Sequence, residues 1–148
     1  MKKFTLLLVL FVTSLASAQL KTSEVKEPTV LGKVSPLGKT SAAIFDYGDY
    51  YQLSYRDAKF VQIDEEDEII IQKSELEDIY ALIVKNFEEK KSGEVKVELK
   101  EGVLYLKFAK GLGMISLEIG SSKTPTSAAA GYSQALTKKQ VDKLFGKK

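Results

Sequence analysis

The sequence predicts an α+β domain in which an antiparallel sheet of about six or seven strands carries one main amphipathic helix on its apolar face, with a short C-terminal helix. Three observations support this fold class. Apolar and polar residues alternate over 94–108 and again over 115–119, as in half-buried strands. Apolar residues recur at helical spacing over 76–87, and turn dipeptides separate the alternating segments.

The N-terminus has the pattern of a secretory signal peptide over residues 1–18. Two lysines precede an apolar run over 4–12, and Ala16-Ser17-Ala18 is the small-x-small pattern that signal peptidase cleaves. The run is shorter than the roughly 20 apolar residues that a membrane span needs. We therefore expect cleavage after Ala18 and export to the periplasm or the medium, with no stable membrane anchor afterwards.

The mature chain begins with a lead-in and continues as one domain. Residues 19–28 have no apolar period and are predicted to be flexible, whereas residues 29–148 are predicted to form a single α+β domain. The domain starts with a short extended segment over 29–34. Pro36 and Gly38 are expected to stop it.

A β-hairpin is predicted over 42–56. Gly48-Asp49 separates two alternating segments, and glycine tolerates the positive φ that a tight hairpin turn requires. This turn places Ile44 opposite Leu53 on one apolar face. The opposite face carries Phe45, Tyr47, Tyr50 and Gln52.

Two further strands, over 59–63 and 68–72, are predicted to complete an antiparallel meander. A helix then begins at Ser74, whose hydroxyl is expected to accept a hydrogen bond from the Glu77 N–H in a capping box. Its apolar stripe consists of Leu76, Ile79, Tyr80, Ile83 and Phe87. We interpret this stripe as the side of the helix that packs into the hydrophobic core, rather than as a ligand site or a partner site.

The strongest strand pattern follows the helix. With a two-residue turn at Glu101-Gly102, Leu99 is expected opposite Leu104, so that both strands present apolar side chains on the same side. A third strand is predicted over 115–119. We expect the helix to cover the apolar face of this sheet, and the first meander to extend the sheet or to pack alongside it.

The C-terminal part is predicted to contain a long loop and a short helix. Residues 120–131 have no period, and a binding element and a plain surface connection explain them equally well. Thr137 and Gln140 form a second capping box, and Gly146 is expected to end the helix that follows.

Composition excludes several kinds of chemistry. The chain has no Cys and no His, which rules out disulfides, the usual zinc sites and any catalytic triad with an imidazole base. Lys and Arg number 22 and Asp and Glu 20. Two of the lysines lie in the predicted signal peptide, so the mature chain has 20 bases and 20 acids and is formally neutral. A neutral chain gives no support for nucleic-acid binding or for binding to anionic lipids.

Lysines are concentrated at the C-terminus, from Lys138 to Lys148. We interpret them mainly as a solvated tail, with electrostatic docking as the alternative.

The acidic run over 64–68 is a candidate calcium site, because clustered carboxylates bind this ion. An EF-hand count from Asp64 puts Glu75 at the last ligand position, but Ile69 stands where the loop needs glycine. We therefore predict no metal site. We interpret the acidic residues as charges that keep the adjacent isoleucine run, Ile69-Ile70-Ile71, from aggregating.

The candidate partner-binding face consists of Phe45, Tyr47 and Tyr50. Tyrosine rings offer amphipathic contact area that suits sugars, peptides or another protein. If the face is covered by another layer, the rings belong to the core, and the sequence favours this second interpretation.

The leading functional hypothesis is an exported, non-enzymatic domain that binds a partner protein or a component of the cell envelope. Two alternatives stay open. One is a carrier that holds a small ligand between helix and sheet, and the other is a carboxylate-dependent hydrolase. No catalytic residue and no cofactor are assigned.

Overall fold

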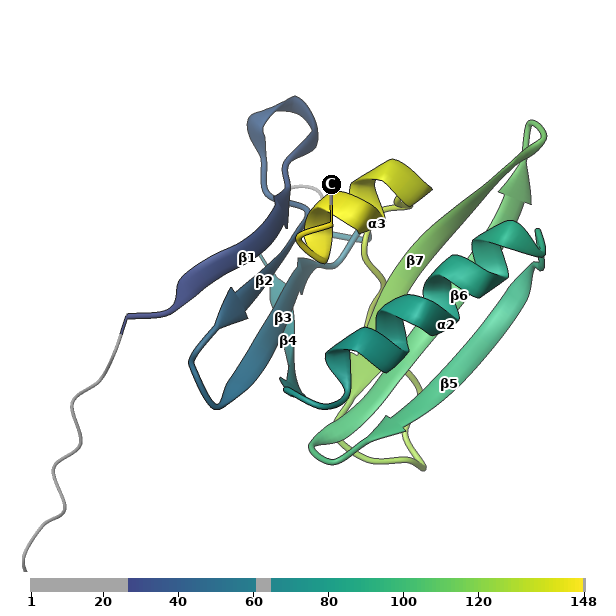
Figure 1. Cartoon of the computed structure of the whole chain (residues 1–148). Helices are drawn as coiled ribbons and strands as arrows, with labels where there is room; N and C mark the ends of the chain where they lie inside the picture. The colour runs from purple at the N-terminus through teal and green to yellow at the C-terminus, as the bar shows by residue number, and fades with distance from the viewer. Residues whose placement is uncertain (1–26, 61–64, 148) are drawn as a thin grey trace, which may run out of the picture.

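The computed structural model describes residues 27–60 and 65–147. Within them the fold class is α+β and mostly sheet, with two antiparallel sheets and two α-helices (Figure 1). The predicted signal peptide and most of the predicted lead-in lie outside the described residues.

The first sheet, sheet A, is a meander with the strand order β1-β2-β3-β4. Its strands are β1 (Thr29–Val34), β2 (Ala42–Asp46), β3 (Tyr50–Arg56) and β4 (Glu66–Gln72), with a 3-10 turn η1 (Pro36–Gly38) after β1. The predicted hairpin register is confirmed, since Ile44 lies opposite Leu53. Gly48 adopts a φ of +91°, which is the conformation for which the turn requires glycine.

The strand predicted over 59–63 is not found in the described residues. Lys59 and Phe60 lie in the connection between β3 and β4, and 61–63 lie outside the described residues. β3 pairs directly with β4, with Arg56 opposite Glu66.

The second sheet, sheet B, has the order β5-β6-β7, formed by β5 (Gly93–Leu99), β6 (Gly102–Gly111) and β7 (Met114–Ser122). The predicted pairing of Leu99 with Leu104 is wrong, because Leu99 lies opposite Gly102. The turn consists of Lys100 and Glu101, and Gly102 already belongs to β6. A shift of two residues keeps every side chain on its predicted face.

The expectation of a single sheet is also corrected, because sheets A and B do not share a hydrogen-bonded strand pair among the described residues. Instead, β4 packs against sheet B through side chains. A Cβ built on Gly102 would touch the Ile69 side chain at 3.6 Å and the Ser122 carbonyl oxygen at 2.9 Å. Glycine is favoured at position 102 by the φ of +133° and by the close Ser122 carbonyl oxygen, whereas the distance to Ile69 is an ordinary contact.

Helix α2 (Leu76–Glu88) lies across one face of sheet B (Figure 1). The rings of Phe87 and Phe108 meet edge to face, with centroids 5.8 Å apart. Sheets A and B and both helices contribute to one hydrophobic core. Its fully buried members include Ile44, Leu53, Ile79, Ile83, Leu106, Leu117, Leu136 and Leu144. Burial of each such side chain contributes about 1.5–3 kcal/mol.

The predicted capping box at Ser74 is wrong. Helix α2 begins at Leu76, and its cap residue is Glu75, which caps no helical N–H with its side chain. The Glu75 carboxylate instead accepts hydrogen bonds from the backbone N–H groups of Gln72, at 2.8 Å, and Lys100, at 2.9 Å. Glu75 thus ties the start of the helix to the β5–β6 turn.

The second capping box is confirmed at the start of helix α3 (Lys138–Leu144). Thr137 accepts from the Gln140 N–H, and the Gln140 side chain accepts from the Thr137 N–H. Helix α3 packs against α2 and β1. The Tyr80 hydroxyl donates to Asp142 at 2.9 Å, and the Tyr80 ring lies 5.4 Å from that of Phe145.

This difference between the two caps leads to a prediction. Thr137→Ala is expected to lower the free energy of unfolding by about 1 kcal/mol, because it removes an acceptor from the first turn of α3. Ser74→Ala is the matched control and is expected to change it by less than about 0.5 kcal/mol. Urea unfolding followed by circular dichroism measures both. Equal losses from the two variants would contradict the assignment of the caps.

Candidate functional site: the aromatic face of sheet A

The residues predicted to form a binding face lie together on the outer side of sheet A. Phe45 pairs with Gln52 across β2 and β3, on the side opposite to Ile44 and Leu53. Tyr47 and Tyr50 flank the turn, and their rings stack with centroids 5.0 Å apart and an interplanar angle of 11°.

All three predicted side chains are half-buried. They are therefore neither core residues nor fully solvated ones, and the rings keep an accessible surface.

Two aliphatic residues extend this surface and were missed by sequence reasoning. Val30 lies opposite Phe45 and is 56% exposed, and Ile70 lies opposite Gln52 and is 36% exposed. We call the set Val30, Phe45, Tyr47, Tyr50, Gln52 and Ile70 the aromatic face. The isoleucine run contained a signal for Ile70, because alternation in a strand puts the middle residue of three on the opposite side.

The accessible part of the aromatic face lies toward the β2–β3 turn. At the other end of the same side, Ala43 and Ser54 are buried, and the Ser54 hydroxyl donates to Glu66 at 3.0 Å.

Ion pairing and ring contacts hold the turn in place. Asp46 Oδ1 accepts from the Gly48 N–H at 2.7 Å and forms an ion pair with Lys73. The Lys73 ammonium, together with the Gly48 N–H, holds the pKa of the Asp46 carboxyl below its ordinary value. Lys73 also lies 3.6 Å from the centre of the Tyr51 ring. The turn that presents the aromatic face is thus tied to the residue that follows β4.

The loop proposed as an alternative binding element is held against sheet B. β7 runs to Ser122, so the loop begins later than predicted. The Tyr105 hydroxyl donates to the Ser127 carbonyl at 2.5 Å, and Lys96 Nζ donates to the Pro125 carbonyl at 2.7 Å. The Tyr132 hydroxyl donates to Glu94 at 2.6 Å. These bonds hold the middle of the loop and the residue that follows it, which weakens the case for the loop as an adaptable binding element.

Ser121, in β7, lies at the contact between sheets A and B. Ser121 is buried, and its hydroxyl lies 2.8 Å from that of Tyr55. Burial raises the pKa of Tyr55 to about 12, so the phenol is neutral at physiological pH. Ser121 therefore has a structural hydrogen-bond partner from the other sheet.

The acidic run begins outside the described residues. Within the described ranges, no group of three or more acidic side chains is placed to hold a metal ion.

A small hollow lies where the carrier hypothesis expects a pocket. It measures about 230 Å³ between α2 and β5 and is lined by Glu75, Asp78, Ile79, Leu82, Val97, Glu98 and Leu99. Pockets for drug-sized ligands usually measure about 300–1,000 Å³. The hollow is therefore small for such a ligand.

Neither α2 nor α3, the two α-helices of the described residues, is long and apolar enough to cross a membrane. No protein-family model, no curated protein and no solved structure matches this chain.

Proposed function

We propose that this protein is an exported, non-enzymatic domain that binds a partner protein or an envelope component through the aromatic face. One observation carries the proposal. Three half-exposed rings share one side of sheet A with Val30 and Ile70, while the other side of the sheet packs into the core. Such a surface suits a partner, because aromatic side chains bury a large area at little cost in conformational entropy.

The rigid presentation of the rings supports the same function. The stacked pair Tyr47 and Tyr50 sits at a turn that Asp46, Gly48 and Lys73 hold together. Binding of a partner there loses little free energy to ordering the turn, because the turn is already fixed. Export follows from the predicted signal peptide and remains part of the proposal.

The small-ligand carrier is the second candidate, and the hollow between α2 and β5 is the observation that favours it. Its volume suits only a ligand smaller than the usual range, so we place it behind the binding domain.

Substitution of the rings tests the binding function. The variant Phe45→Thr, Tyr47→Ser, Tyr50→Thr keeps residues that strands and turns accept, so the fold is expected to survive. Binding to a detergent-solubilised envelope fraction should fall roughly tenfold or more, as expected when interface hot spots are removed. The measurement is quantitative capture on the immobilised protein, with thermal unfolding as a check of folding.

Phe60→Thr is the matched control, because Phe60 is an exposed ring outside the aromatic face. It should retain wild-type capture. A triple variant that folds and still captures the same protein or component with wild-type affinity would contradict the proposal.

A further inference from the structure

The β6–β7 hairpin ends in a tip that contributes little to the fold. The last strand pair is Gly111 with Met114, so Leu112 and Gly113 alone connect the strands. Their φ values are +50° and +78°, as in a type I′ turn. In Figure 1 this end of the hairpin projects beyond the end of α2.

Leucine is an unusual choice at the first turn position. A left-handed conformation brings its Cβ close to the following carbonyl oxygen, and type I′ turns favour Asn, Asp or Gly there. Leu112 is nevertheless fully exposed, and Met114 beside it is 66% exposed. These are the two most exposed large hydrophobic side chains of the described residues. Because Leu112 is fully exposed, burial of its side chain does not offset the strain of the turn, which points to a role outside the folded domain.

A basic groove lies at the base of the tip. It measures about 390 Å³ between α2, the hairpin and the start of α3, and Phe87, Met114 and Ile115 supply its apolar lining. Its charged lining consists of Lys90, Lys110, Lys138, Lys139 and Glu88.

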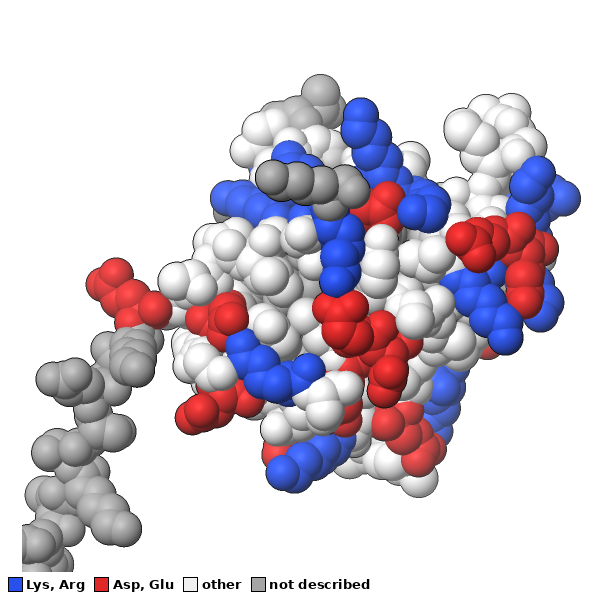
Figure 2. Space-filling view, in the orientation of Figure 1, with Lys and Arg blue, Asp and Glu red and all other residues white. Residues whose placement is uncertain are grey.

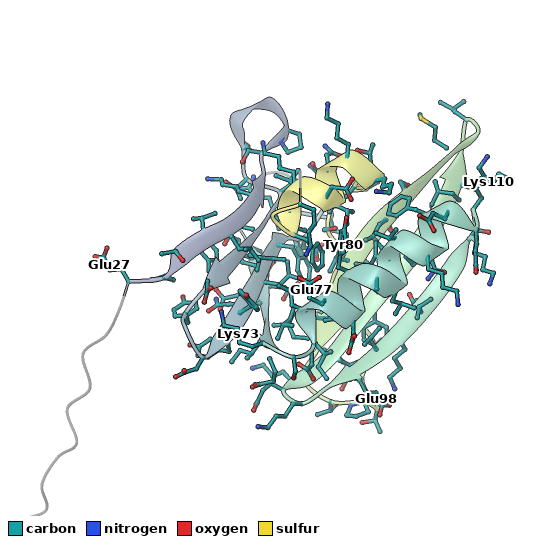
Figure 3. All side chains as sticks on the ribbon, viewed as in Figure 1. Glu27, Lys73, Glu77, Tyr80, Glu98 and Lys110 are labelled. Carbon is teal, nitrogen blue, oxygen red and sulfur yellow. The ribbon has the colours of Figure 1, made fainter. Side chains whose placement is uncertain are left out.

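Most of this positive charge is not neutralised within the domain. Lys138 pairs with Asp142. Lys90, Lys110 and Lys139 form no ion pair within 27–60 and 65–147. Figure 2 shows an uncoloured projection at the hairpin end, with basic and acidic side chains below it, and Figure 3 labels Lys110 beside the tip.

We propose that the hairpin tip docks the protein on an anionic lipid surface. Leu112 and Met114 enter the boundary between headgroups and acyl chains, and Lys90, Lys110 and Lys139 face the lipid phosphates. Of the C-terminal lysines, this gives Lys139 a docking role, whereas Lys138 and Lys147 form ion pairs with Asp142 and Glu77.

A lipid surface fits better than an acidic protein for two reasons. The tip is a projecting wedge of two apolar side chains, which a fluid surface accommodates without a matching pocket. The positive charges are lysines, whose flexible side chains suit lipid phosphates that have no fixed positions. The single arginine of the chain, Arg56, lies in β3, away from the tip. Two apolar side chains and a few lysines give weak, reversible binding that is sensitive to salt.

This proposal does not depend on the aromatic face, which belongs to the other sheet. Both proposals can be true at once. The aromatic face then binds a partner while the hairpin tip contacts a membrane.

The absence of tryptophan from the chain allows a direct test. In Leu112→Trp, a single fluorophore replaces the apolar tip residue. With the protein purified after removal of residues 1–18, its emission should shift to the blue on vesicles of phosphatidylglycerol and phosphatidylcholine. It should stay unchanged on phosphatidylcholine alone and in inorganic phosphate. Val30→Trp is the matched control on the aromatic face and should show no shift.

A second variant separates docking from folding. Leu112→Asn installs a residue that the turn prefers, so the midpoint of thermal unfolding should stay the same or rise, while flotation with anionic vesicles should fall roughly tenfold. Unchanged Leu112→Trp emission on anionic vesicles, or wild-type flotation of Leu112→Asn, would overturn the proposal. Capture of an acidic protein through Leu112 without vesicle binding would also overturn it.

Discussion

Replacement of Leu106 by alanine should lower the free energy of unfolding by about 2–5 kcal/mol. Leu106 is fully buried in the middle strand of sheet B, between Val95 and Ile119. Its side chain lies on the face that α2 covers, next to Phe108, which contacts Phe87 of the helix. The truncation removes apolar contacts and leaves a cavity that strands paired on both sides cannot easily close.

Urea unfolding followed by far-ultraviolet circular dichroism and by tyrosine fluorescence measures this loss. Glu98→Ala, at an exposed position of β5, is the control and should change stability by less than about 0.5 kcal/mol. A loss below about 1 kcal/mol for Leu106→Ala would mean that α2 does not close the core over sheet B.

Replacement of Gly32 by alanine is expected to have the second large effect. A Cβ at this position would overlap the backbone carbonyl oxygens of Lys143 and Leu144 at the end of α3. Backbone atoms cannot rotate away as a side chain can, so α3 or β1 has to move. We expect a loss of about 1–3 kcal/mol or more, as for other overpacked sites.

Gly111→Ala is the matched control for this prediction. Gly111 has open space around its Cβ position, and its φ lies outside the left-handed region, so alanine should be tolerated. Differential scanning calorimetry compares the two variants. Equal thermal midpoints would show that α3 does not dock against β1 as described.

Local patterns predicted the elements that are stabilised locally. The turn at Gly48-Asp49 and the alternation around it gave the correct register of β2 and β3, because a tight turn and the alternation constrain the same pairing. The capping box of Thr137 and Gln140 was correct for a similar reason, since both partners lie within one helical turn.

Predictions failed where a distant segment competes for a residue. Glu75 accepts a hydrogen bond from Lys100, which lies far along the chain, and this contact accompanies a helix start that differs from the predicted one. Gly102 lies in β6 beside the Ser122 carbonyl oxygen, and the turn forms one residue earlier than predicted. The division into two sheets has the same origin, because no local signal says whether the edge of β4 is hydrogen-bonded or covered by side chains.

The candidate binding face could be predicted only in part. Alternation and the turn placed Phe45, Tyr47 and Tyr50 on one side of the hairpin. Val30 and Ile70 join them only when β1 and β4 are paired with that hairpin. The exposure of Leu112 was also not predictable, since it depends on a turn of two residues whose type the sequence Leu-Gly does not specify.

Site-specific photo-crosslinking tests the central claim, binding through the aromatic face, most directly. A photoreactive amino acid at Ile70, on that face, is compared with one at Glu98, an exposed position of sheet B. After irradiation of envelope preparations, the account predicts a discrete crosslinked species from position 70 that disappears when Phe45, Tyr47 and Tyr50 are substituted, and no such species from position 98. No crosslink from position 70, or the same species from both positions, would contradict it.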